Sequence, residues 1–309
     1  MSLRRQLLGR VGLGLLSIWG ALTIVFVLGR LTGDPARLMS PPGAPPEQVA
    51  QIREALGFDR PILVQYADYL TDAAQADLGA SYYWQRDALD LVLERVWPTV
   101  YLALAAMAFA IIIGISLGLL AGFFRGRLAD RLLVRSTMLG QAIPSFWLGP
   151  VLILLVSVEL GWLPAGGMRD VGSVILPAIT LGSFQLALLF RMTRATTIEA
   201  LGQDYVVMAR AKGTGGVRLA VSHVLPNTAL PTMTLAGLGL AALIGGSVIV
   251  ESIFSWPGVG FLLLQAVQQR DFPVVQSVAL LYSVGFVTLN TVVDLLYRVA
   301  DPRLRSESL

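Results

Sequence analysis

The chain lacks several residue types on which common protein chemistries depend. It contains no cysteine, a single histidine (His223) and a single lysine (Lys212). Without cysteine there is no disulfide bond, thiolate nucleophile or sulfur-ligated metal, and one histidine cannot build a histidine metal cluster. No Gly-x4-Gly-Lys-Ser/Thr loop for nucleotide phosphates occurs, since Lys212 precedes Gly213. We therefore expect no catalytic residue, bound cofactor or metal in this chain.

Charged residues are also scarce, and long apolar runs take their place. Only 14% of the 309 residues are charged, whereas about a quarter is usual in soluble domains. The mean hydropathy is +0.69. Six uncharged runs meet or approach the ~20 residues needed to cross a bilayer core of ~30 Å. They are Val11–Gly29, Thr99–Phe124, Ser136–Val158, Val171–Phe190, Val224–Val250 and Phe272–Val293. The composition predicts an all-α polytopic membrane protein with six transmembrane helices.

Flanking residues refine the ends of these spans. Pro226 and Pro273 are typical helix-start prolines, so we place the spans at 11–29, 99–122, 136–158, 171–190, 228–250 and 275–296. Arginines precede the first run as in a signal peptide. Its nineteen residues and the lack of a small-residue cleavage site favour an uncleaved anchor.

The distribution of charge predicts the orientation. If both termini are cytoplasmic, the inner segments (1–10, 125–135, 191–223 and 294–309) carry a net charge of +9 and the outer segments −6. An excess of Lys and Arg marks cytoplasmic loops. We therefore expect cytoplasmic ends at 1–10 and 297–309. The overall charge of +3 reflects topology and gives no support to nucleic-acid binding.

The sequence predicts two parts beyond the first span. Residues 30–96 form an outer insert, with one helix starting at Pro46 and stopping at Gly57 and a second after Pro61. The insert is either a folded surface element or a platform for an extracytoplasmic partner. The five later spans, residues 97–296, are expected to form one compact unit joined by short loops.

The inner loop 199–226 carries an unusual polar segment. Asp204 is a candidate N-cap and Gly213 a candidate C-terminal stop, which predicts a helix from Tyr205 to Lys212. Helices shorter than about 12 residues are marginal in water, so this one should dock onto something. Tyr205, Met208, Ala209 and Lys212 share one face, where the small Ala209 would permit close approach.

The spacing Ala209-x3-Gly213-x11-Leu225-Pro226 resembles the EAA loop of membrane subunits of binding-protein-dependent ABC importers. The chain departs from that pattern at Val207, Met208 and His223, as the peptide/nickel branch does. Further segments resemble the B-type subunit of this branch along nearly the whole chain. They are Gly33–Pro35, Leu56–Pro61, Gln65–Tyr66, Asp77–Ser81, Ile143–Phe146, Trp162–Gly167, Gly202–Tyr205, Ala209–Gly213, Val250–Gly260 and Asp301–Arg303.

The resemblance implies a type I ABC importer transmembrane fold in a bacterial inner membrane. Residues 205–213 would be a coupling helix seated in an ATPase subunit, with Arg210 and Lys212 as polar contacts and Leu225 and Pro226 completing the motif. ATP and Mg²⁺ would be bound by two partner ATP-binding subunits. A second, homologous membrane subunit and an extracytoplasmic binding protein would complete the importer. The implied cargo is a di- or oligopeptide, with nickel chelates, glutathione and opines left open.

A second motif follows the fifth span. Glu251 is placed at the outer face, where it is followed by Trp256-Pro257-Gly258 and Gly260. A structural or gate-hinge role is favoured over direct substrate contact. A stand-alone channel or ion-driven carrier would need charged or polar residues within the spans or an inverted repeat, and we expect neither. An intramembrane enzyme would need a catalytic constellation that this composition does not provide.

Overall fold

The protein is described by a computed structural model that covers residues 3–31, 33–34, 36–37, 40, 43–55 and 57–300. For residues 3–11, 230, 289–290 and 292–300 it describes the backbone alone. The chain divides into two compact units, residues 98–260 and residues 1–97 together with 261–309. The described residues form helices and no strand, apart from a single antiparallel bridge between Ala80 and Asp87.

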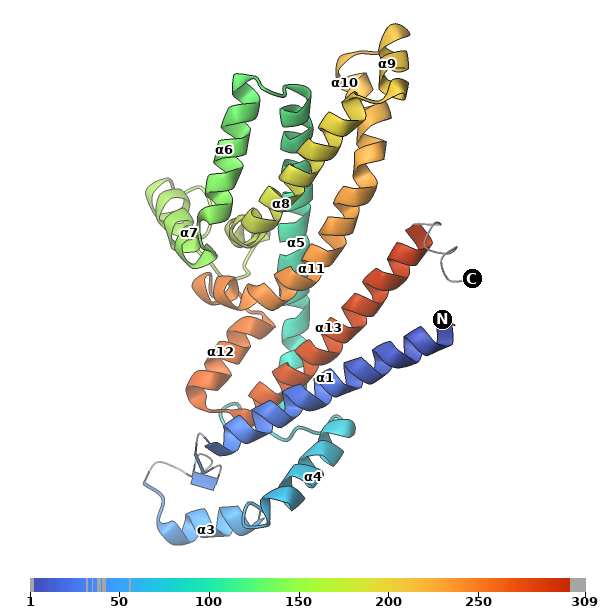
Figure 1. The fold of residues 1–309 in the computed structure, drawn as a ribbon. Helices are drawn as coiled ribbons and strands as arrows, with labels where there is room; N and C mark the ends of the chain where they lie inside the picture. Colours follow the sequence, from blue (N-terminus) through green and yellow to red (C-terminus); the bar gives the residue numbers. More distant parts are fainter. Residues whose placement is uncertain are drawn as a thin grey trace. The chain divides into compact units, whose positions relative to one another are not determined.

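The unit formed by both ends of the chain is built on two long helices. α1 (Leu3–Leu31) lies beside α13 (Phe272–Ala300), as Figure 1 shows. The insert contributes α3 (Pro46–Ala55) and α4 (Ile62–Ala74), close to the predicted helices after Pro46 and Pro61. α4 packs through Ala73 against Leu22 of α1, and Phe26 stacks on Tyr69 at 5.4 Å between ring centroids. The insert is therefore a folded element.

One buried carboxylate closes this unit. Asp271, at the corner between α12 (Val259–Gln269) and α13, is fully buried. It accepts hydrogen bonds from the Ser81 hydroxyl and from the backbone N–H groups of Tyr82 (3.2 Å) and Tyr83 (3.1 Å). Burial, with Asp271 nearby, raises the pKa of Tyr82 to about 12. Ser81 ends the Asp77–Ser81 motif, so that motif anchors the insert.

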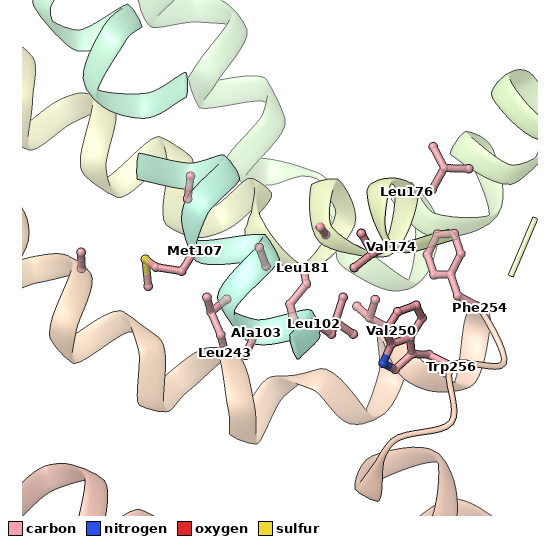
Figure 2. Packing of buried hydrophobic residues seen from close by; sticks show 14 of the residues in the cluster. Leu102, Ala103, Met107, Val174, Leu176, Leu181, Leu243, Val250, Phe254 and Trp256 are labelled. Atoms are coloured by element: carbon pink, nitrogen blue, oxygen red, sulfur yellow. The ribbon is translucent and has the colours of Figure 1, made fainter. Parts of the chain in front are cut away.

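The second unit, residues 98–260, contains most of the apolar helices. Its elements are α5 (Ala88–Phe123, entering from the other unit), α6 (Leu128–Ala142), α7 (Ser145–Leu152), a π-helical segment (Ile153–Glu159), a 3₁₀ turn (Val171–Val174), α8 (Ile175–Leu201), α9 (Asp204–Ala211), α10 (Gly216–Leu219), a π-helical turn (Ala220–Val224) and α11 (Leu225–Ile253). Figure 2 shows the core, where Leu102 and Met107 of α5 meet Leu181 of α8, Leu243 of α11 and the following Trp256.

The predicted spans correspond to these helices with one correction. Among the described residues, four stretches are long and apolar enough to cross a membrane: Gly12–Leu31, Ala88–Phe123, Val171–Leu201 and Pro231–Ile253. The sixth predicted span lies within the 29-residue α13. The third predicted span, over 136–158, is not a straight helix in the structure but a broken one. α6 and the segment Ser145–Glu159 meet at a bend of 104°.

The bend has a local cause. Pro144 has no backbone N–H to continue the hydrogen bonds of α6, and its ring disfavours helical geometry at the preceding residue. Ile143 is accordingly extended, with φ −79° and ψ 119°. A second proline, Pro150, lies inside the short α7.

The predicted compact unit at 97–296 also differs from the structure. α13 belongs to the same unit as α1, and the other unit ends at Gly260. The physical reason is the pairing of the first and last apolar helices, which sequence distance does not reveal.

A row of glycines on α5 fixes its contact with α8. A Cβ atom added to Gly118 would lie 2.7 Å from the Thr193 Cβ, and one added to Gly122 would lie 2.5 Å from Thr197. An added Cβ at Gly114 would lie 3.0 Å from the Leu186 carbonyl oxygen of α8. Small residues four apart let two membrane helices approach closely. This contact depends on the absence of side chains from one face of α5.

We predict that Gly118→Ala lowers stability while Gly140→Ala does not. An alanine at 118 overpacks the α5–α8 contact, which costs about 1–3 kcal/mol. Gly140 in α6 has open space around the same added atom. Both substitutions raise helix propensity, so the difference between the unfolding midpoints of the two variants reports the α5–α8 contact. The measurement is the midpoint of thermal unfolding in detergent, and equal midpoints for the two variants would contradict the packing argument.

Candidate functional site

The inner loop of the sequence analysis forms a short helical tip between α8 and α11. α9 follows α8 after two residues, α10 follows α9, and a π-helical turn at Ala220–Val224 leads directly into α11. Figure 1 shows α9 and α10 at one end of α8 and α11, far along these helices from α7. The tip is thus carried by two of the longest helices of its unit.

α9 begins and ends close to the predicted positions, with one correction. The N-cap residue is Gln203, not Asp204, and it makes no side-chain capping bond. Asp204 is the first helical residue, where its charge favours the positive end of the helix dipole. Gly213 is left-handed, with φ +84°, and its N–H donates to the Arg210 carbonyl at 2.9 Å. The predicted C-terminal stop is therefore correct.

The buried side of α9 packs within the chain. Val206 and Ala209 form a cluster with Ala200 of α8, Leu219 of α10 and Val224. Ala209 is only 6% exposed. The expectation that its small side chain lets a partner approach is therefore wrong, because its close neighbour is its own chain. This internal packing also explains how an eight-residue helix is stable.

The opposite side of α9 is open and unusually apolar for a loop. Val207 is 59% exposed and Met208 61%. Tyr205, Arg210 and Lys212 are exposed around them. Across the tip, Val217 of α10 and Val221 are exposed as well. We call Tyr205, Val207, Met208, Arg210, Lys212, Val217 and Val221 the tip surface. Exposed apolar side chains bordered by polar ones are typical of a protein contact.

The end of the motif shapes the entry to α11. Pro226 lies in the first turn of α11, where a missing N–H costs little. The Asn227 side chain donates to the His223 carbonyl at 2.7 Å. π-helical turns are rare and often lie at functional sites. Leu225 and Pro226 therefore set the direction of α11, and Pro226 is exposed next to the tip surface.

The second predicted site is an anchored turn at the other end of α11. Glu251 is not outside the fifth span, as predicted, but inside α11 and fully buried. The predicted end of the fifth span was therefore too early, because a carboxylate so near the end of an apolar run is normally exposed. Its Oε1 accepts hydrogen bonds from the hydroxyls of Thr99 and Ser247, both at 2.8 Å. Hydrogen-bonded partners offset the cost of burying a carboxylate.

The residues after Glu251 close around its carboxylate. An added Cβ at Gly258 would lie 2.4 Å from Oε2, and one at Gly260 would lie 3.0 Å from it. Trp256 is fully buried, and its indole N–H donates to the Pro98 carbonyl at 2.9 Å. Pro257 makes the link between Trp256 and Gly258. These contacts hold the end of α11 against α5.

A third link was missed by the sequence analysis. Asp130 at the start of α6 is buried and binds Arg194 of α8 through two bonds, of 2.7 and 2.9 Å. It also accepts from the Gly126 N–H at 2.8 Å. The residues lie 64 positions apart, so no local pattern predicts their pairing. The bond ties α6 to the part of α8 that leads into the tip.

We predict that Thr99→Val destabilises the protein more than Thr196→Val. The Thr99 hydroxyl donates to Glu251 and accepts from the Val259 N–H at 2.8 Å. Its loss leaves buried polar groups with fewer partners, which costs about 1–3 kcal/mol. The Thr196 hydroxyl bonds only carbonyls of its own helix. Thermal unfolding in detergent checks this, and a smaller loss for Thr99→Val would show that the anchor is unimportant.

Comparison with known proteins places this architecture in a family. Residues 114–306 match the family described as "Binding-protein-dependent transport system inner membrane component", and residues 2–103 match the corresponding N-terminal family. The chain is 40% identical, over 290 residues and 94% of both chains, to the glutathione transport system permease protein GsiC of Escherichia coli K12. The same values hold for GsiC of Shigella dysenteriae serotype 1.

Solved structures show the same fold at lower identity. The inward-facing MetNI methionine ABC transporter matches with a TM-score of 0.57 and 20% identity, covering 68% of this chain and 96% of that one. An amino acid ABC transporter crystallised with histidines matches with a TM-score of 0.52 and 16% identity, covering 68% and 94%. The predicted importer fold is confirmed. The chain belongs to the inner membrane components of binding-protein-dependent transport systems and is a membrane subunit of an ABC importer.

Proposed function

We propose that this chain forms half of the translocation pathway of an importer for di- and oligopeptides, and that the tip surface receives an ATPase subunit. The observation that carries the proposal is the exposed apolar face of α9, with Val207 and Met208 more than half exposed. Burying such side chains against a partner releases about 25 cal/mol per Å². Arg210 and Lys212 border this face and suit an acidic rim on the partner.

The internal packing of α9 defines how a movement of the ATPase subunit would be transmitted to the long helices. Val206 and Ala209 fix α9 to α8 and to the turn before α11. A rigid-body movement of a bound ATPase would therefore move the ends of both long helices. ATP and Mg²⁺ would be bound by two ATP-binding subunits, and this chain supplies no part of that site in the proposal.

We further propose the orientation and remaining partners. The inner excess of Lys and Arg supports cytoplasmic termini and a tip in the cytoplasm of a bacterium. The folded insert, with α3 and α4, then faces outward as a platform for a substrate-binding protein. A cleft of about 470 Å³ lies against it, lined by residues that include Arg30, Phe58 and Tyr69. A second, homologous membrane subunit would complete the pathway.

The proposed cargo is a short peptide. The support is the 40% identity to a glutathione permease across 94% of both chains, since glutathione is itself a tripeptide. Nickel chelates and opines remain alternatives of the same architecture. Uptake of labelled dipeptides, reduced glutathione and ⁶³Ni²⁺ chelates by cells with the complete importer separates them. Uptake of the nickel chelate alone would overturn the peptide assignment.

We predict that Met208→Glu abolishes most uptake without removing the protein from the membrane. A carboxylate on the apolar contact would be buried unpaired, and losses of about 2 kcal/mol or more, above tenfold in affinity, are typical at the centre of interfaces. Leu128→Glu is the matched control, because Leu128 is 72% exposed in another predicted inner segment. Co-purification of the ATPase subunits and uptake are measured together.

Retained ATPase binding by Met208→Glu would disprove the tip as the docking site. A substitution is preferable to deleting α9, because Val206 and Ala209 also stabilise the chain itself.

A further inference from the structure

A cleft within the unit of residues 98–260 has features that neither the tip nor the anchored turn uses. It has a volume of about 500 Å³ and lies where the bend at Pro144 meets α8 and α11. Three of the predicted spans therefore contribute to its wall. Its polar lining residues are Gln141, Ser145, Thr180, Ser183 and Gln185. Binding sites for small molecules typically occupy about 300–1,000 Å³, so the size suits a compact ligand.

The chemistry of the wall is polar but uncharged. Among the described residues that line the cleft, none carries an ionisable side chain. The apolar part comes from residues such as Phe184 and Leu238, both more than half exposed. A ligand in this cleft meets amide and hydroxyl groups between apolar surfaces, and no fixed charge attracts or repels it.

Gln185 is held in place by a glycine. It is 96% buried, and its Nε2 donates to the Leu235 carbonyl at 3.3 Å. A Cβ added to Gly239 would lie 2.2 Å from that nitrogen, so the amide lies flat against the backbone of α11. Gly239 thus keeps space for a polar group in a wall of apolar helices. A buried amide without such a purpose would be costly in this setting.

Several of these side chains have hydrogen-bonding capacity to spare. Within the described residues, the side chains of Gln141 and Ser145 make no hydrogen bond, and the side-chain oxygen of Gln185 accepts none. An acyl chain of a lipid would leave all of these groups unsatisfied. A peptide backbone presents N–H and C=O groups at regular intervals and would satisfy them.

We propose that this cleft receives the backbone of the peptide cargo during its passage, with Gln185 as a hydrogen-bonding residue. This inference rests on the proposed function. Because the wall is uncharged, it treats cationic and anionic peptides alike, and recognition is by the backbone that every peptide shares. Selection among side chains is then left to other parts of the importer.

The absence of cysteine allows a direct test of access. Ser183→Cys and Ala242→Cys each place a single thiol on the cleft, and Ile112→Cys places one on an exposed apolar face of α5 outside it. The complete importer is treated with a membrane-impermeant methanethiosulfonate, and labelling of this chain is measured by mass. Thiolates react and thiols in apolar surroundings do not, so we expect roughly tenfold faster labelling at the cleft.

The cargo should protect the cleft. With trialanine, supplied with the binding protein and ATP, labelling of Ser183→Cys should slow while that of Ile112→Cys does not change. Equal labelling of the cleft and control positions, in an importer that still takes up trialanine, overturns the inference and leaves the proposed function standing. Absence of uptake of trialanine, dipeptides and glutathione alike by the unmodified importer would instead refute the proposed function.

Charge placed in the cleft provides a second test. Ser183→Asp should favour peptides with lysine over those with glutamate by about fivefold relative to the unmodified importer, because the new carboxylate lies in a partly desolvated site. Comparing each peptide with itself in the unmodified importer cancels the preference of the binding protein. Gln185→Leu should raise the KM for trialanine by a similar factor. The proposal is contradicted if neither the preference for lysine over glutamate peptides nor the KM for trialanine changes.

Discussion

The packing of the unit 98–260 depends on the buried carboxylate of Glu251, which fixes the end of α11 against α5. It joins the last turn of α11 to the Thr99 hydroxyl of α5, and Gly258 and Gly260 pack directly on it. Trp256 then closes the core that Leu102, Leu243 and Val250 form. A hydrophobic core alone would let α11 slide or rotate, since apolar contacts have little direction. Hydrogen bonds to one carboxylate remove that freedom.

α11 consequently links three features along one helix. Its first turn, at Leu225 and Pro226, follows directly from the tip where α9 and α10 lie. Its middle carries Gly239, which holds Gln185 at the cleft. Its last turn carries Glu251. A displacement applied at the tip acts on a helix whose far end is fixed, so the middle must tilt or bend. Pro231, inside α11, is a position where bending costs little backbone hydrogen bonding.

The sequence predicted features with a local signature and missed those that depend on distant partners. Gly213 and Pro226 marked helix ends because a left-handed residue and a missing N–H have local effects. Pro144 likewise indicates a break in the helix, but a proline in the sequence does not predict the angle of the bend. Asp204 was misread as a cap, since a side chain at either of two neighbouring positions fits the pattern. Ala209 was assigned to a partner because its real neighbour, Val224, lies in another element.

Glu251 shows most clearly why the remainder could not be read from the sequence. A single carboxylate one residue beyond an apolar run is normally taken as the solvent-exposed end of a span. Whether it is buried depends on donors from elsewhere, here Thr99, which is 152 positions away. The same limit applies to Asp130 and Arg194, and to the glycines of α5 against Thr193 and Thr197. In each case the residue type makes the contact possible, but the contact forms only because two helices pack against each other. Polar groups inside a membrane protein are therefore better judged by their partners than by their position along a hydropathy profile.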